Sequence, residues 1–213
     1  MAVRDKDLKK KIKRYDNIVM FPSSHDIRPE HLEESLTFLQ HILEAGNKVL
    51  IVSKPFLRCI QAICERFKAY TVQIVFRFTI GSTDDNVLKF WEPNAPSFNE
   101  RLEALRWAFN AGFTTSVSCE PMLDNKIERV IDAVTPYVNE TIWLGKANHL
   151  LGEKGRGRLE MNGVALPEVV ARAEELIQWQ SDENILALYD KYKDNPMIRW
   201  KDSVEKVVKR RNE

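Results

Sequence analysis

Short apolar segments alternate with segments of helical spacing along much of the chain, and this alternation limits the possible folds more than any other feature. The apolar segments are predicted to be strands at Asn17–Pro22, Lys48–Ser53, Val72–Ile80, Thr114–Cys119 and Thr141–Gly145. Strands that are apolar on both faces and are joined by helices are typical of a parallel sheet with crossover helices. The sequence therefore predicts an α/β fold with parallel strands.

The helices between these strands have recognisable ends. In one of them Leu32, Leu36 and Leu39 recur at helical spacing, and the pattern ends at Gly46, a residue type common just past helix ends. Another is expected to begin near Ser97 and to end at Gly112. Its Ser-x-x-Glu start is typical of a capping box, in which two side chains satisfy backbone N–H groups.

Composition shifts divide the chain into three regions. Residues 1–16 are rich in lysine and arginine and are expected to form a polar helix or arm. Residues 17–150 hold the strand and helix repeat, and residues 151–213 hold a basic loop followed by a C-terminal helical extension. Within the extension, Ile198–Trp200 is expected to be a short final strand or a strap.

Composition also limits the classes of partner. The 213 residues carry a net charge of +1, so overall electrostatics give no support for nucleic acid as a partner. No apolar run approaches the roughly 20 residues of a membrane helix, and a membrane partner is not expected. The N-terminus MAVRDKDLKKK lacks the apolar core of a signal peptide, which predicts a cytoplasmic location.

Three cysteines, Cys59, Cys64 and Cys119, are too few and too scattered to indicate a disulfide framework. Cys59 and Cys64 lie five residues apart on a predicted helix, which places their thiols roughly 140° apart around its axis. That separation is poor for shared metal ligation, and free cysteine is among the most buried residue types. Both are therefore predicted to be core residues.

Arg77 interrupts an otherwise apolar predicted strand. Side chains alternate across a strand, so Phe76 and Phe78 are expected on one face and Arg77 and Thr79 on the other. Further polar residues come directly after the predicted strands, at 23–26, 53–54, 81–82, Glu120 and Lys146. In parallel α/β folds ligands bind at the carboxyl ends of the strands. The sequence predicts that Arg77 and Thr79 face a ligand pocket there.

Several segments, taken in order, resemble blocks of the radical S-adenosylmethionine (radical SAM) proteins, most closely the branch that contains spore photoproduct lyase. They are FPSSHDIRPE, VLIVSKP, FRFTIGSTDDNVLKFWEPNAPSFNERLEALRWAFNAG, SVSCEPMLD and TIWLGKANHL. The resemblance covers about Asn17 to His149, with an extension to Trp200 through IRWKDS. It implies a partial (β/α) TIM-like barrel that binds SAM across the carboxyl ends of its strands.

The sequence departs from that family at one point. The family carries CxxxCxxC after its first strand, where three thiolates hold a four-iron four-sulfur cluster; this chain has no such motif. The chain is expected to begin just before the family's second strand, so the barrel lacks its first strand. A cluster is expected only if a missing N-terminal segment supplies the cysteines. Alone, the chain is expected to be inactive, as a fragment or a degenerate member.

The resemblance also implies roles for four residues. Lys54 is placed near the carboxylate of SAM, Ser24 and Asp26 near its methionine end, and Thr79 near its ribose or carboxylate. Two structural alternatives remain open. Lys54 can pair with Asp26 or Glu120, and the segment around Ser24 can cap the helix that follows.

Four other positions are candidates from their residue types and places. Arg77 is expected to neutralise an anionic ligand or to support Glu120, because a buried guanidinium needs a partner. Glu120 is followed by Pro121, which aims its carboxylate into the mouth of the sheet. Lys146 and His149 follow the fifth predicted strand and are candidates for substrate contacts, although a lone histidine is usually just a satisfied polar group.

Three hypotheses of function follow. The first is a radical SAM-type domain that binds SAM but lacks its own cluster. The second is a non-catalytic binding protein that self-associates through the sheet edge exposed by the missing strand. The third is an α/β enzyme that acts on an anionic metabolite through Arg77, Lys54 and Glu120. A DNA substrate is not inferred from the spore photoproduct lyase branch, because fold-level analogy does not carry a substrate.

Overall fold

The computed structural model describes residues 12–23, 25–148, 150 and 166–211. The chain divides into two compact units. Unit 1 comprises Met1–Thr79, Ala95–Val117 and Ala133–Glu140, and unit 2 comprises Ile80–Asn94, Ser118–Asp132 and Thr141–Glu213. The three regions expected from composition are not the same as these units, because each unit is assembled from segments that are distant in the sequence.

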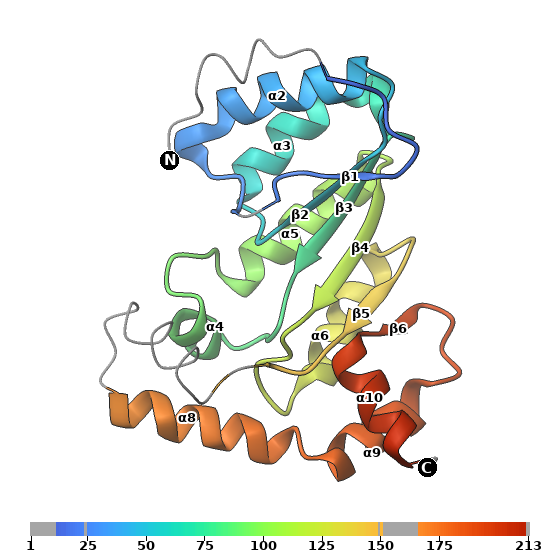
Figure 1. Cartoon of the computed structure of the whole chain (residues 1–213). Helices are drawn as coiled ribbons and strands as arrows, with labels where there is room; N and C mark the ends of the chain where they lie inside the picture. The colour runs from blue at the N-terminus through green and yellow to red at the C-terminus, as the bar shows by residue number, and fades with distance from the viewer. Residues whose placement is uncertain (1–11, 24, 149, 151–165, 212–213) are drawn as a thin grey trace. The chain divides into compact units, whose positions relative to one another are not determined.

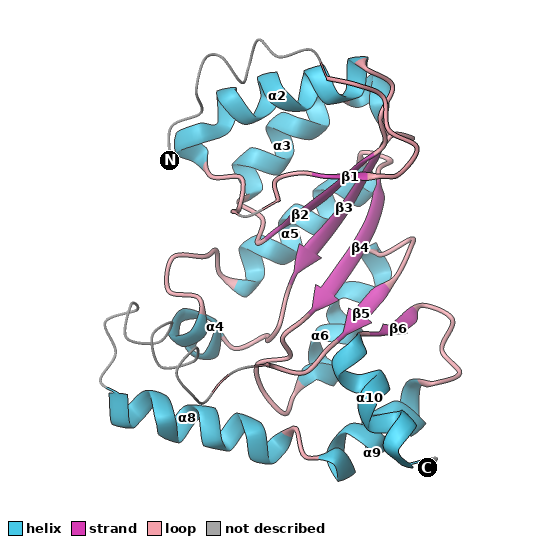
Figure 2. Ribbon diagram, in the orientation of Figure 1, coloured by secondary structure: helices cyan, strands magenta, loops and turns pink. Residues whose placement is uncertain are grey.

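The described residues contain one six-stranded parallel sheet, drawn in magenta in Figure 2. Its strands are β1 (Val19–Met20), β2 (Val49–Ser53), β3 (Ile74–Thr79), β4 (Thr114–Cys119), β5 (Ile142–Leu144) and β6 (Ile198–Trp200). The spatial order is β1-β2-β3-β4-β5-β6, the same as the order in the sequence. The α/β class with parallel strands is therefore confirmed, and Ile198–Trp200 is a strand that pairs in parallel with β5.

Helices connect the strands, as Figure 1 shows. The longer ones are α2 (Leu32–Glu44), α3 (Leu57–Arg66), α4 (Asp85–Trp91), α5 (Phe98–Asn110), α6 (Ile127–Val134), α8 (Leu166–Trp179), α9 (Asp182–Tyr192) and α10 (Asp202–Arg211). Three short 3₁₀ helices lie at Pro29–His31 (η1), Lys68–Tyr70 (η2) and Thr135–Tyr137 (η3). The helical segment after β4 changes from α to 3₁₀ geometry at Thr135, next to Pro136, which has no N–H to donate.

The alternation predicted for β3 is present. Phe76 and Phe78 are fully buried, with ring centroids 5.3 Å apart, and Phe113 packs edge-on against Phe76. Arg77 lies on the opposite face of the strand, where its side chain is 18% exposed. Three aromatic rings therefore form the core on one face of β3, while the other face carries the guanidinium.

The ends of α2 and α5 follow the glycine and serine signals in the sequence. Gly46 and Gly112 have φ values of 79° and 82°, a left-handed conformation that glycine adopts without steric cost. Ser97 Oγ accepts a hydrogen bond from the Glu100 N–H at 3.3 Å, as a capping box requires. The Glu100 carboxylate, however, accepts from the Leu57 N–H at 3.1 Å, so it joins α5 to the start of α3.

Arg101 on α5 is fully buried, although no motif in the sequence marks it. Its Nε donates to the carbonyl oxygen of Pro96 at 2.8 Å, and its Nη1 donates to that of Thr79 at 3.1 Å. The guanidinium therefore satisfies backbone carbonyls at the beginning of α5 and at the end of β3. A buried charge is stable only with such partners.

We expect Arg101→Met to lower the free energy of unfolding by about 3 kcal/mol, because two buried carbonyls lose their donor. The midpoint of thermal unfolding should fall by roughly 6–12 °C. Arg106→Met is a matched control, since Arg106 lies on the same helix with a side chain that is 52% exposed. Its change should stay within about 0.5 kcal/mol. Equal losses in the two variants would contradict the role assigned to Arg101.

Candidate functional site

Charged residues follow three strand ends in unit 2. Glu120 comes directly after β4, Lys146 shortly after β5 and Lys201 directly after β6. The Lys201 Nζ lies 2.9 Å from Glu120 Oε2, and the side chains of Lys201 and Glu120 are 28% and 32% exposed. Their ion pair is thus half-buried at the carboxyl ends of β4 and β6, the two strands on either side of β5, as expected for a ligand site in a parallel sheet.

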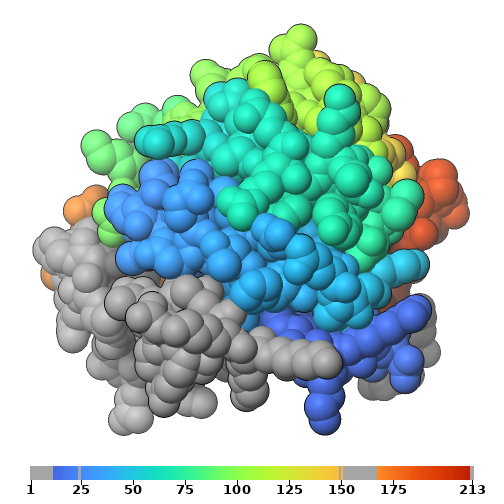
Figure 3. Space-filling model, turned by 90° about the horizontal axis from the view of Figure 1, so that it is seen from above, coloured from blue at the N-terminus to red at the C-terminus, as the bar shows by residue number. Residues whose placement is uncertain are grey.

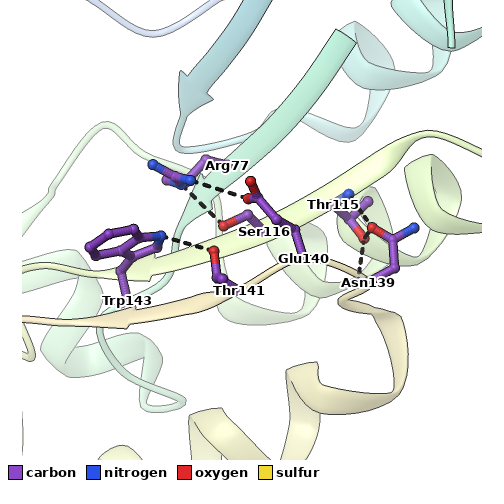
Figure 4. Close-up of polar contacts among 7 residues, drawn as sticks. All are labelled: Arg77, Thr115, Ser116, Asn139, Glu140, Thr141 and Trp143. Carbon is purple, nitrogen blue, oxygen red and sulfur yellow. Dashed lines mark hydrogen bonds and ion pairs between the residues drawn. The ribbon is translucent and has the colours of Figure 1, made fainter. Parts of the chain in front are cut away.

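Trp143 on β5 adds an aromatic face to this site. The Lys201 Nζ lies 5.3 Å from the centre of the Trp143 ring, within the range of a cation–π interaction. The indole Nε1 donates to Thr141 Oγ1 at 2.9 Å, which fixes the plane of the ring, as Figure 4 shows. One ammonium group therefore faces both a carboxylate and an aromatic ring.

Gly145 makes this close approach possible. A Cβ atom at this position would lie 2.9 Å from Cγ of Glu120 and 3.0 Å from Cγ of Lys201, closer than side chains pack. The Gly145 N–H donates to the Cys119 carbonyl at 3.1 Å, and the Gly145 carbonyl accepts from the Met122 N–H at 3.0 Å. We call Glu120, Trp143, Gly145, Lys146 and Lys201 the strand-end cluster.

Lys146 contributes a second ammonium group to the cluster. Its backbone N–H donates to Ser203 Oγ at 2.9 Å, which fixes the chain beside the first turn of α10. Its Nζ lies 3.7 Å from Asp182 Oδ1, and the Lys146 side chain is 21% exposed. Asp182 also pairs with Arg210 at 2.8 Å. Asp182 is therefore shared between Lys146 and Arg210.

A second polar group lies in unit 1, after β1 and β2. Asp26 Oδ1 accepts from Ser53 Oγ at 3.1 Å and from the Lys54 N–H at 2.7 Å. The Lys54 Nζ lies 3.7 Å from Asp26 Oδ2, and the Lys54 and Asp26 side chains are 29% and 30% exposed. The structural alternative, in which Lys54 pairs with Asp26, is therefore present. Both groups remain accessible to solvent.

Arg77 has described partners that sequence reasoning missed. Its Nε donates to Ser116 Oγ and its Nη2 to Glu140 Oε2, each at 3.1 Å, as Figure 4 shows. Ser116 lies on β4 and Glu140 in the segment before β5. Glu140 is 63 residues from Arg77 in the sequence, so no local pattern indicates the pair. The guanidinium is largely buried, as predicted.

The remaining predicted site residues are Thr79, Ser24 and His149. Thr79 is half-buried at the end of β3, and its carbonyl accepts from Arg101. Ser24 and His149 lie outside the described residues.

Among the residues that the structure does describe, no helix has the length and apolar character to cross a membrane.

The three cysteines do not form a site for an iron–sulfur cluster. Cys59 and Cys64 lie in the apolar face of α3, Cys119 ends β4, and none of them is more than 3% exposed. Burial raises the pKa of the Cys59 thiol to about 11 and the pKa of Cys64 to about 12, and it also raises the pKa of Cys119. Cluster ligation requires thiolates, so this donor set does not fit. The core role predicted for Cys59 and Cys64 is confirmed.

Comparisons with known proteins add one similarity. The uncharacterised protein ORF301 of Acidianus two-tailed virus is 30% identical over 112 residues, which cover 52% of this chain and 36% of the viral protein. The chain thus spans well under two thirds of that relative. No family model matches the chain, and no solved structure is significantly similar to it.

We expect the native protein to resist thiol alkylation by iodoacetamide at a pH near 8.5, because all three buried thiols stay protonated. Denatured protein should take up three equivalents, which mass spectrometry counts. An unfolded thiol ionises near pH 9 while the folded thiols do not, so the unfolded state binds fewer protons above that pH. Stability should therefore fall as the pH rises above about 9. Rapid alkylation of the native protein would contradict this assignment.

Proposed function

We propose that this chain is a partial (β/α) barrel of the radical SAM type whose strand-end cluster binds SAM or a related zwitterionic ligand. The observation that carries the proposal is the environment of Lys201. Its ammonium group pairs with Glu120 at 2.9 Å and lies over the Trp143 ring at 5.3 Å, at the carboxyl ends of parallel strands.

The chemistry of the cluster complements the methionine end of SAM. That end carries a carboxylate, an ammonium and a sulfonium group. Lys146 and Lys201 provide cations for the carboxylate, and Glu120 provides an anion for the ammonium. The Trp143 ring already faces one cation, and aromatic faces attract alkylated cations in the same way. The sulfonium group would take the position over this ring.

The strand order supports the barrel part of the proposal. Parallel strands joined by right-handed crossovers, each moving in the same direction, place their helices on one face of the sheet. A barrel has this order, whereas a doubly wound sheet reverses direction at a switch point. The observed order, β1 to β6 without reversal, favours a partial barrel.

The proposal covers binding and assigns no radical step. SAM cleavage in the family that the sequence resembles requires an electron from a cluster held by thiolates. Cys59 and Cys64 are buried on α3 and Cys119 is buried at the end of β4; burial raises the pKa of all three thiols, and they do not fit that role. An iron–sulfur cluster therefore takes part in no step of the function proposed for this chain.

We expect calorimetric titration with SAM to give saturable binding that Glu120→Gln weakens by roughly tenfold, because one charge-assisted hydrogen bond is lost. Lys201→Met should weaken binding to a similar extent. Glu128→Gln is a matched control, since Glu128 forms a lysine pair at 2.6 Å, with Lys191, outside the cluster.

Other results of this titration would separate the hypotheses. An anionic metabolite held only by the lysines should bind more tightly to Glu120→Gln, because the variant removes a repelling charge. Inorganic phosphate serves as the probe for that case. Absence of binding by SAM, S-adenosylhomocysteine and methionine would contradict the proposal.

A second candidate function is self-assembly through the edge of the sheet in unit 1. β1 is an edge strand of only two residues, and Tyr15, Ile18 and Met20 in and before it are 56%, 46% and 51% exposed. The segment that leads into β1, dark blue in Figure 3, lies at the surface. Exposed apolar residues at a sheet edge favour pairing with another chain.

We expect light scattering after size-exclusion chromatography to show a dimer at high protein concentration if this edge pairs. Met20→Lys should shift the equilibrium toward monomer, because a charged edge residue disfavours strand pairing. Val72→Lys is a control at another exposed apolar position, since Val72 is 82% exposed and lies outside the strands. A monomer at all concentrations would count against this function.

A further inference from the structure

A pocket of about 200 Å³ lies in unit 2 between α4, α8 and the segment that follows β4. Figure 1 shows α4 and α8 as neighbours. The residues that line it come from all three: Val87, Phe90 and Trp91; Leu123, Asp124 and Asn125; and Arg172, Glu175, Leu176 and Trp179. None of them belongs to the strand-end cluster. The pocket is therefore a distinct feature of unit 2.

Three of the residues that line the pocket are aromatic. Phe90 and Trp91 meet edge to face with their ring centroids 5.0 Å apart, and Trp179 lines the pocket from α8. The Arg172 guanidinium lies 5.2 Å from the centre of the Phe90 ring. Rings and a guanidinium plane are the surfaces on which planar ligands stack. This composition favours a flat, unsaturated ligand.

The size of the pocket restricts that ligand further. Pockets for complete drug-sized molecules are roughly 300–1,000 Å³, so a pocket of about 200 Å³ suits a single ring system. The whole of SAM would not fit inside it. A nucleobase is a planar ring system of suitable size with a polar edge.

The polar residues of the pocket select among the bases. Arg172 and Glu175 lie three residues apart on α8, so both point to the same side of the helix. Guanine carries two acceptors, O6 and N7, to which arginine can donate hydrogen bonds. Beside them it carries N–H groups, from which a carboxylate can accept hydrogen bonds. Adenine and cytosine carry an amino group where guanine has O6. Uracil has a single N–H donor on that edge, where guanine has an adjacent pair. Neighbouring arginine and glutamate therefore match guanine best.

Both carboxylate oxygens of Asp124 already accept hydrogen bonds from the protein. One of its oxygens accepts from Ser82 Oγ and the other accepts from the Lys126 N–H at 2.7 Å. These bonds hold the segment after β4 in place and shape one wall of the pocket. Glu175, which is exposed, is then the carboxylate available for recognition.

We propose that the pocket between α4 and α8 binds a guanine base, stacked among Phe90, Trp91 and Trp179 and read by Arg172 and Glu175. The base can come from a free nucleoside or from single-stranded nucleic acid, because both present the same ring. This site is separate from the strand-end cluster and does not depend on the function proposed for it.

The test is titration of the full chain with guanosine, adenosine, cytidine and uridine, followed by calorimetry and tryptophan fluorescence. Guanosine should bind saturably, quench the fluorescence of the pocket tryptophans, and bind at least roughly fivefold more tightly than the other three. A short guanine-containing oligonucleotide distinguishes the sources: tighter binding than guanosine indicates nucleic acid, and equal binding indicates the nucleoside.

Variants then assign the site. Glu175→Gln should weaken guanosine by roughly tenfold and leave adenosine unchanged. Glu174→Gln is a matched control, since Glu174 is an exposed neighbour on α8 that does not line the pocket. Glu120→Gln should leave guanosine binding intact even if SAM does not bind.

Three outcomes would overturn the proposal. The first is no guanosine binding up to roughly millimolar concentration. The second is equal binding of all four nucleosides, or equal loss in Glu175→Gln and Glu174→Gln. The third is displacement of guanosine by methionine, which has no base, because this would make the two sites one.

Discussion

Backbone hydrogen bonds that continue past the ends of β4, β5 and β6 hold the strand-end cluster together. Gly145 donates to Cys119 and accepts from Met122, and the Lys201 N–H donates to the Leu144 carbonyl at 2.9 Å. These bonds fix the chain at Glu120, Lys146 and Lys201 without using any side chain of the cluster. The charged groups are thus positioned by the sheet itself, which keeps them available for a ligand.

The energetics of this arrangement depend on burial. An exposed ion pair contributes little to stability, whereas a fully buried pair carries a large desolvation cost. Glu120 and Lys201 lie between these limits, with each side chain roughly a third exposed. The desolvation cost is therefore small when a ligand of equivalent charge replaces one partner of this pair. Arg101, by contrast, is fully buried and bonded to backbone carbonyls, which indicates a structural role.

Unit 2 offers two different environments for ligands. The strand-end cluster is charged, with one aromatic ring, and suits a zwitterion. The pocket between α4 and α8 includes three aromatic side chains and suits a flat ring. Both lie on segments that follow strands, as in other parallel α/β folds, where the sheet provides the rigid support and the connections vary.

Local patterns in the sequence predicted most of the fold. The alternation of strands and helices, the buried phenylalanines of β3 and the glycines that end α2 and α5 depend on neighbouring residues, so they can be read from short segments. Glu120 and Lys146 were identified for the same reason, because they directly follow strands.

Tertiary structure alone decided the partners of these residues. The Glu120–Lys201, Arg77–Glu140 and Asp26–Lys54 pairs join segments far apart in the sequence. The aromatic pocket likewise combines α4 and α8, which no periodicity connects. Hydrophobic periodicity specifies which face of an element is buried, but the choice of charged partner depends on how the chain crosses over between strands. The sequence by itself therefore determined the elements and their polar ends, and the packing of those elements determined which charges meet.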